Sequence, residues 1–471
     1  MKALIILAAF SIPFSASGQS DFKKYFTDET MRVDYFHSGT KGEEKFSLDA
    51  VVADGSWPGS RVNLIDTLAL GEFHFRVSDL ATGRMLYTRG YSTMFNEWQT
   101  TDEAAAGVWR TMQESIRFPF PKRPVQVTIA RRDRNLVFHE LFSCSINPND
   151  PLQVRKEKRK GYSSYSLLNN GPPAVKVDIA VLGDGYAEGD MDKYRSDAEH
   201  FTDQLFSTQP FKSRKVDFNV HVVEVESDDS GIDVPDKDVW KNNALGTTYS
   251  TFGSARYVLS GDNKAVMNAA ASVPYDFICI LINDKRYGGG GIYNLYATTY
   301  TGEENESQKW QMDYVYVHEF GHSFGGLGDE YYSSSTAYND FYPKGVEPWE
   351  PNVTALANPG GLKWSRLATP GIAVPSSWEK TTYDSLEALR GKLDRLAPDY
   401  YEKREPLYKA AMALLKQSKS AGTVGAFEGA GYASKGLYRP SVDCRMFSLS
   451  LVDFDPVCSA AINRVIDFYA R

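Results

Sequence analysis

The sequence has few cysteines for its length, only four in 471 residues. A fold of this size cannot be built on so few disulfides, so its stability must come from packing. After the first two dozen residues, no segment approaches the roughly 18 uncharged apolar residues that a membrane helix needs. Basic charge is not in excess either, because 52 Lys and Arg stand against 60 Asp and Glu, for a net charge of −8. We therefore expect neither an integral membrane segment nor a nucleic-acid partner.

What the chain does contain is ample apolar material, with 42% hydrophobic and 13% aromatic residues. This composition excludes a disordered or fibrous protein and supports two or three domains. Residues 1–18 begin MKALIILAAF and end in small residues, an order typical of a secretory signal peptide. No cysteine follows the small residues, so a lipoprotein anchor is not expected. The sequence predicts an exported protein, periplasmic or extracellular.

The rest of the chain divides into regions that differ in their pattern of apolar and polar residues. Over residues 19–150, apolar side chains alternate, as at Phe73, Phe75 and Val77, which predicts an N-terminal antiparallel β-sandwich. Residues 151–174 are rich in charge, Ser, Asn, Gly and Pro and are interpreted as a linker.

Residues 175–471 combine short apolar runs with helical spacing, as expected of an α/β or α+β domain. With the β-rich residues before them, the expected fold class of the chain is α+β. Within residues 175–471, the segment 383–418 predicts helices interrupted at Pro398 and Pro406.

The motif H-E-x-x-H occurs at His318, Glu319 and His322. On an α-helix, residues four apart share a face, so both imidazoles can bind one Zn²⁺. Glu319 can then take a proton from a water molecule at the metal. A solvent-facing helix with two histidines and a carboxylate is the structural alternative.

A catalytic zinc needs a third protein ligand. Two glycines follow the motif, and we expect Gly326 to turn the chain back so that Asp329 supplies this ligand. Glu330 is the second choice, and an N-cap or salt-bridge role for either acid is the alternative. Cys444 and Cys458 are fourteen residues apart and could close a disulfide, which the spacing leaves open.

Three segments together resemble the bacterial immunoglobulin-A-peptidase family of metzincin-like zinc endopeptidases. They are HEFGHSFGGLGDEYY at 318–332, LGDGY at 182–186, and GAGYASKGLYRPSVDCRM at 429–446 followed by PVC at 456–458. The resemblance implies a zincin catalytic domain, a protein or glycoprotein substrate, and a turn that places Met446 beneath the ligand histidines. Some metzincins carry a tyrosine two residues after this methionine. That position is Ser448 here, so the resemblance leaves Tyr438, or Tyr432, to assist the oxyanion.

These expectations define a mechanism and its competitor. The mechanism is zinc-dependent cleavage of peptide bonds, with Glu319 as general base and then proton donor. Residues 287–292, rich in glycine, are expected to form either an edge strand that pairs with extended substrate or a mobile hairpin loop. The competing function is a glycoprotein-binding surface protein with a non-catalytic zinc domain. The oligomeric state is left open.

Overall fold

The structure is a computed structural model that describes residues 18–471, except for 157–160, 303–308, 334–340, 359 and 395–398. The predicted signal peptide therefore lies almost entirely outside the described residues. Among the described helices, none is long and apolar enough to cross a membrane.

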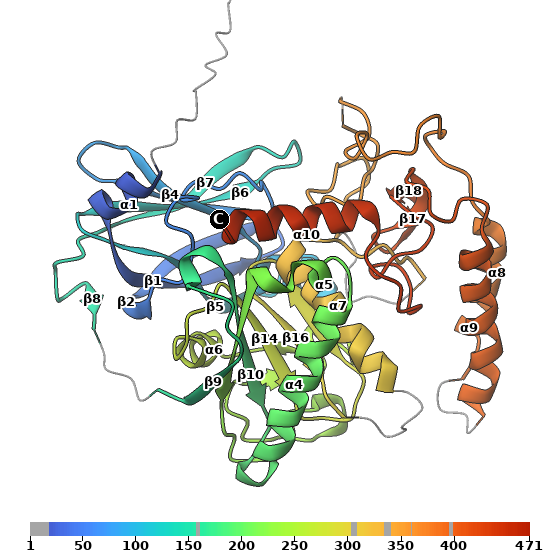
Figure 1. Ribbon diagram of the computed structural model, residues 1–471, viewed down its shortest axis with the longest axis horizontal. Coiled ribbons are helices and arrows are strands. Elements are labelled where there is room, and N and C mark those ends of the chain that lie inside the picture. The colour runs from blue at the N-terminus through green and yellow to red at the C-terminus, as the bar shows by residue number, and fades with distance from the viewer. Residues whose placement is uncertain (1–17, 157–160, 303–308, 334–340, 359, 395–398) are drawn as a thin grey trace, which may run out of the picture.

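Two four-stranded sheets form the N-terminal part of the chain (Figure 1). The first, in the order β5-β1-β2-β8, contains β1 (Phe26–Thr40), β2 (Glu43–Ser56), β5 (Arg110–Pro121) and β8 (Val154–Arg155). The second, in the order β4-β3-β6-β7, contains β3 (Phe73–Asp79), β4 (Met85–Tyr91), β6 (Val125–Arg132) and β7 (Phe138–Ile146). Short helices α1 (Gly18–Tyr25), α2 (Met94–Trp98) and α3 (Asp102–Ala105) accompany them.

The core between these sheets follows the alternation in the sequence. Phe73, Phe75 and Val77 of β3 are each at most 3% exposed and share one cluster with Val33 and Tyr35 of β1. Every second residue of a strand points to the same face, so an alternating pattern buries one complete face.

A six-stranded mixed sheet, in the order β15-β16-β14-β10-β11-β9, is the framework of the second part. Its strands are β9 (Ser163–Leu168), β10 (Val177–Asp184), β11 (Phe218–Glu224), β14 (Phe277–Ile282), β15 (Gly289–Ile292) and β16 (Tyr296–Tyr300). The four inner strands are parallel, while β9 and β15 run antiparallel at the two edges. The mixed α/β character expected from the sequence is confirmed.

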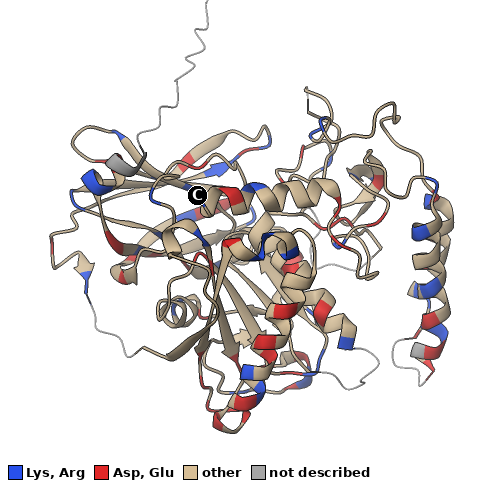
Figure 2. Cartoon of the chain, viewed as in Figure 1, with Lys and Arg blue, Asp and Glu red and all other residues tan. Residues whose placement is uncertain are grey.

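Each face of this sheet has its own core. Odd-numbered residues of β10 such as Ile179 join a cluster with α4 (Met191–Ser207) and α7 (Lys309–Gly325), whereas even-numbered residues such as Leu182 join a cluster with α6 (Asn263–Ala270). Both faces are therefore covered, which explains why β10 and β14 are continuous apolar runs. Lys, Arg, Asp and Glu are interspersed along the exposed side of α4 (Figure 2).

The C-terminal segments complete the second part. Their elements are α8 (Lys380–Gly391), α9 (Tyr400–Gln417), β17 (Phe427–Ala430), β18 (Ala433–Arg439) and α10 (Pro456–Tyr469). Further short elements are α5 (Phe211–Arg214), β12 (Thr247–Thr248) and β13 (Leu259–Ser260). Helices α8 and α9 project as a pair, while α10 packs on α7 and reaches the N-terminal sheets (Figure 1). There Nδ2 of Asn63 donates to the carbonyl of Phe468 at 2.8 Å.

Two details differ from the sequence-based expectations. The predicted linker 151–174 contributes strands to both parts, because β8 pairs with β2 and β9 pairs with β11. Helix α9 also continues through Pro406, where a break was expected; Pro398 lies outside the described residues. Proline's fixed φ is compatible with a helix, and the carbonyl that loses its partner belongs to Glu402, an exposed residue at which water can bind.

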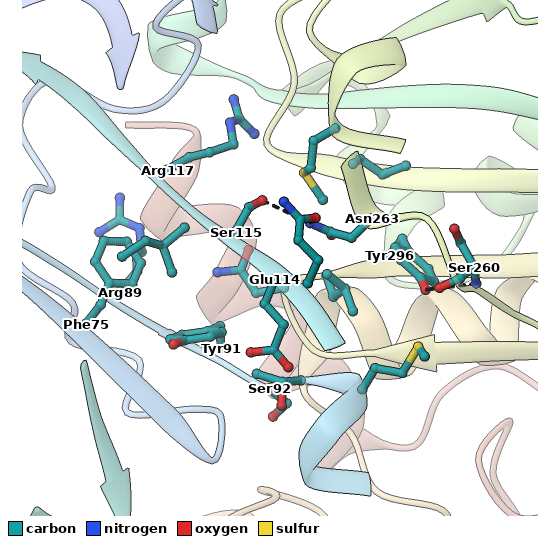
Figure 3. Close-up of a pocket in the computed structure, with 18 of the residues that line it drawn as sticks. Phe75, Arg89, Tyr91, Ser92, Glu114, Ser115, Arg117, Ser260, Asn263 and Tyr296 are labelled. Carbon is teal, nitrogen blue, oxygen red and sulfur yellow. Dashed lines mark hydrogen bonds between the residues drawn. The ribbon is translucent and has the colours of Figure 1, made fainter. Parts of the chain in front are cut away.

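A cavity of about 470 Å³ lies between the two parts (Figure 3). Phe75, Arg89 and Glu114 line it from the N-terminal sheets, and Asn263 and Tyr296 line it from the second part. Among the described residues that line this cavity, none belongs to the H-E-x-x-H motif. This cavity is therefore a feature of the interface between the two parts, separate from the predicted metal site.

Candidate metal centre

Helix α7 carries the H-E-x-x-H motif and is held firmly against the six-stranded sheet. Val315 and Val317 on its apolar face are at most 2% exposed. The four-residue spacing brings His318 and His322 onto one face, where their Nε2 atoms are 3.2 Å apart. Most of this site is closed to water, since His318 is 4% exposed.

The helix ends where the glycine pair predicts. Helix α7 ends at Gly325, and Gly326 adopts a left-handed φ of 60°. A side chain at Gly326 would come 3.1 Å from Trp349 and 3.2 Å from Tyr293, so space as well as backbone conformation favours glycine there. The turn carries Asp329 back beside the helix.

Asp329 meets both histidines at one point. Its Oδ1 lies 3.0 Å from Nε2 of His318 and 3.3 Å from Nε2 of His322. The side chain of Asp329 is 5% exposed, and within the described chain Oδ1 has no hydrogen-bond partner. Two imidazole nitrogens and one carboxylate oxygen therefore converge at a single buried spot.

The hydrogen bonds of the two Nδ1 atoms determine that the Nε2 atoms face the point shared with Asp329. Nδ1 of His322 is 2.6 Å from the carbonyl of Leu327, and Nδ1 of His318 is 3.1 Å from the carbonyl of Arg445. A carbonyl only accepts, so each Nδ1 carries the hydrogen, and each Nε2 of a neutral ring presents a lone pair. Two lone pairs and a carboxylate oxygen this close repel one another unless a proton or a metal cation lies between them. Without a metal, Asp329 outweighs the effect of burial and raises the pKa of His322 to about 10. The donor set therefore fits Zn²⁺, which prefers tetrahedral nitrogen and oxygen ligands.

Glu319 follows the first histidine and lies beside the edge strand. A side chain at Gly289 of β15 would come 3.2 Å from Cγ of Glu319. Burial raises the pKa of Glu319, while the neighbouring imidazoles of His318 and His322 act in the opposite direction. A carboxylate with a raised pKa is a better proton acceptor than an exposed one.

Of the two tyrosines considered from the sequence, the structure brings one to the metal-ligand trio. The hydroxyl of Tyr432 donates to Oδ2 of Asp329 at 2.5 Å. Tyr438 lies in β18, where its backbone pairs with Thr354 and Glu428. Over the described residues, no contact joins the phenol of Tyr438 to the trio. Tyr438 is therefore not brought to the site, because strand pairing fixes it elsewhere.

Met446 lies beneath the helix. It is fully buried, and a side chain at Gly321 of α7 would come 3.0 Å from its Sδ. Gly321 directly precedes His322, so the sulfur packs under the ligand-bearing turn of the helix, in the position that the resemblance implies. The carbonyl of Met446 also accepts from the backbone N–H of Glu330 at 2.9 Å, which joins this turn to the loop that carries Asp329.

Glu330, the second choice for a ligand, does not face the trio. Its Oε1 accepts from Nδ2 of Asn352 at 2.9 Å and lies 3.2 Å from Sγ of Cys458. Cys444 and Cys458 are reduced, with their Sγ atoms 3.8 Å apart. The two acids therefore diverge, and Glu330 joins the cysteines on the other side of the loop.

The residues around the trio that sequence reasoning missed fall into two kinds. The carbonyls of Leu327 and Arg445 are backbone atoms, for which residue type carries no signal. Tyr314 also lies beside the site, with its hydroxyl 3.0 Å from Nδ1 of His318. It stands four residues before His318, so helical spacing could have identified it.

Comparison with known protein families gives two matches. Residues 165–466 match the family described as IgA Peptidase M64, and residues 21–143 match the family described as Peptidase M64 N-terminus. The first match includes the whole of α7 and the turn that carries Met446. A search of curated proteins finds no match.

Proposed function

Since the chain belongs to the IgA peptidase M64 family and is thus a peptidase, we propose that it is an exported, zinc-dependent endopeptidase acting on proteins or glycoproteins. The proposal includes the finer fold assignment, an N-terminal antiparallel β-sandwich followed by a metzincin-like domain. The packing of two sheets on one core supports the sandwich, and the methionine turn beneath α7 supports the metzincin-like domain.

One observation carries the proposal: His318, His322 and Asp329 present three ligand atoms to one point. Their separations of 3.0, 3.2 and 3.3 Å suit a tetrahedral ion with bonds of about 2.0–2.1 Å. Three protein ligands leave the fourth position to water or substrate, which is the pattern of catalytic rather than structural zinc sites.

Bound zinc would polarise the scissile carbonyl and lower the pKa of water to about 7. Glu319 is the residue that accepts the proton of the attacking water and then passes it to the leaving amine. Its raised pKa suits both steps. The carbonyls of Leu327 and Arg445 hold the two imidazoles in the tautomer that leaves Nε2 free, and Tyr432 orients the carboxylate of Asp329.

The edge strand β15 is the element suited to bind the substrate backbone. Along one edge, β15 pairs with β16, where Gly290 lies opposite Thr298. On the opposite edge of β15, the N–H of Gly289 donates to the carbonyl of Arg256, and the carbonyl of Gly289 accepts from the N–H of Val258. Gly291, two residues further along, presents its backbone groups on that same opposite edge. We propose that an extended peptide pairs with Gly291 beside Glu319.

Incubation of the purified protein with a mixture of proteins and glycoproteins tests this function. We expect internal cleavage, detected by mass spectrometry of the fragments, that a chelator abolishes and Zn²⁺ restores. Binding without fragments would support the surface-binding alternative, and release of terminal residues alone would indicate an exopeptidase. Fragmentation that persists after complete metal removal would refute zinc dependence. Analysis of the secreted and periplasmic fractions tests export.

A further inference from the structure

A second group of metal-ligand side chains lies on the other side of the Asp329 loop. It consists of Glu330, Cys444, Asp455 and Cys458, called here the cysteine-carboxylate cluster. Each offers one ligand atom, and all four atoms lie within 4.8 Å of one another. The four residues are between 0% and 6% exposed.

The separation of the two sulfurs distinguishes between the bonds they can form. Sγ of Cys444 and Sγ of Cys458 are 3.8 Å apart. A disulfide bond is about 2.05 Å long. Two thiolates bound to one tetrahedral Zn²⁺ at about 2.3 Å lie about 3.8 Å from each other. The observed distance is too long for a disulfide, and it equals both the spacing of two ligands of a shared ion and that of an S–H···S contact between two thiols.

The backbone around Cys444 is arranged to stabilise a thiolate. The N–H of Met446 donates to its Sγ at 3.5 Å, and the N–H of Asp455 donates at 3.4 Å. Cys458 stands in the first turn of α10, where the helix dipole favours negative charge. Burial and the neighbouring carboxylates nevertheless raise the pKa of both thiols, so these contacts orient the sulfurs and a cation is needed to hold them as thiolates.

The two carboxylates each keep one oxygen without a partner. Oδ1 of Asp455 caps α10 by accepting from the N–H groups of Val457 and Cys458, at 2.7 and 2.9 Å. Oε1 of Glu330 accepts from Asn352. Within the described chain, Oδ2 of Asp455 and Oε2 of Glu330 have no hydrogen-bond partner, although both side chains are buried. A buried carboxylate oxygen without a partner is costly, and a cation removes that cost.

The basic side chain whose charge acts on Glu330 does not fill this role. Arg439 interacts electrostatically with Glu330, but its terminal nitrogens donate to the carbonyls of Gly429 at 2.6 Å and Val442 at 3.2 Å. Its charge therefore offsets part of the negative charge of the cluster without binding the free carboxylate oxygens.

We propose that the cysteine-carboxylate cluster binds a second Zn²⁺ with a structural role. Thiolate ligands select a borderline-soft ion over Mg²⁺ or Ca²⁺, and four protein ligands close the coordination sphere, as in structural zinc sites. Binding displaces the two thiol protons to solvent. The ion ties together the loop after Asp329, the turn before Met446 and the first turn of α10. It therefore holds the parts that shape the trio, and it does not depend on the proposed peptidase activity.

Elemental analysis and thiol titration of the full chain test the second ion. We expect about two zinc ions per chain, and four titratable thiols once the protein is denatured with a chelator, since the chain has four cysteines. One zinc with only two titratable thiols would mean a disulfide between Cys444 and Cys458, and would overturn the proposal. One zinc with four thiols would overturn it too if that ion is lost in His322→Ala, because the ion would then belong to the trio.

Cobalt substitution assigns each ion to its site. Only thiolate ligands give a sulfur-to-Co²⁺ charge-transfer band, so we expect the band in the wild type and in His322→Ala. It should disappear in Cys458→Ser, whose metal content should fall from about two to about one per chain. Cys144→Ser, a partly buried cysteine of β7, is the matched control and should keep both. If Cys458→Ser does not fold, the wild-type and His322→Ala spectra still decide, because a missing band in both refutes thiolate ligation.

Discussion

The trio of His318, His322 and Asp329 and the cysteine-carboxylate cluster lie on either side of one peptide bond, yet they offer different numbers of ligands. The trio presents three atoms, and the side chain of His322 keeps 14% of its surface exposed. The cluster presents four atoms and is buried throughout. The difference indicates that one loop serves two purposes, because Asp329 belongs to an open site suited to chemistry and Glu330 to a closed site suited to stability.

Glu319→Gln is the sharpest way to separate chemistry from metal binding at the open site. The amide cannot accept a proton, so we expect the cleavage rate to fall by about 10²–10⁴-fold. The metal content should stay unchanged at both sites, because Glu319 is a ligand in neither. Kinetics with a cleaved peptide and elemental analysis of the same preparation give both values. If the variant keeps full activity, Glu319 is not the general base. If the variant loses one zinc ion, Glu319 is a metal ligand instead.

Tyr432→Phe tests the support of the open site. The substitution removes the hydroxyl that donates to Oδ2 of Asp329 at 2.5 Å. Loss of a group that orients a metal ligand commonly costs 10–100-fold in metal affinity or activity, and we expect an effect of about that size. Zinc affinity, measured by competition with a chelating dye, is the readout. The thiolate band of the cobalt-substituted protein should not change.

The matched control for this variant is Tyr438→Phe. Its phenol is partly exposed and outside the trio, so the change in stability should stay within about 0.5 kcal/mol, with activity retained. A larger loss of activity in Tyr438→Phe than in Tyr432→Phe would reverse the assignment and restore the residue that sequence reasoning preferred.

Gly291→Ala should disturb the open site alone. A side chain there would come 2.3 Å from the backbone carbonyl of Glu319 and 3.0 Å from Cβ of His322. Relieving this overlap requires β15 or α7 to shift, at a cost of about 1–3 kcal/mol in the free energy of unfolding. Urea unfolding measures the loss. In Gly189→Ala the added carbon meets nothing within 4 Å, so that control should change stability little.

Much of the open site could be predicted because its signals are local. The spacing of His318 and His322 specifies a shared helix face, and Gly326 specifies where the chain turns back. Alternation likewise indicated the buried faces of the N-terminal strands. Local signals failed at Pro406, where the helix continues because an exposed carbonyl can bind water in place of the missing N–H.

The cysteine-carboxylate cluster could not be predicted from local sequence patterns. Glu330 and Cys458 are 128 residues apart, and Tyr432 is 103 residues from Asp329. Their spacing in the sequence leaves open whether Cys444 and Cys458 close a loop. Whether two sulfurs form a disulfide or share an ion depends on their separation and on the carboxylates beside them, and only the folded chain specifies these.

An ion pair outside both sites gives the smallest expected effect. Nε2 of His200 on α4 lies 2.6 Å from Oδ1 of Asp313 on α7. This hydrogen bond is the main reason that the pKa of His200 is raised. A histidine with a raised pKa stabilises the fold fully below its unfolded pKa of about 6.5, and the contribution is lost as the pH rises through the folded value.

The side chain of His200 is 40% exposed, so the loss should stay below about 1 kcal/mol. His200→Gln should flatten this part of the urea-unfolding profile between about pH 6 and pH 8 while leaving both metal contents unchanged, and an unaltered profile would show that the pair contributes nothing.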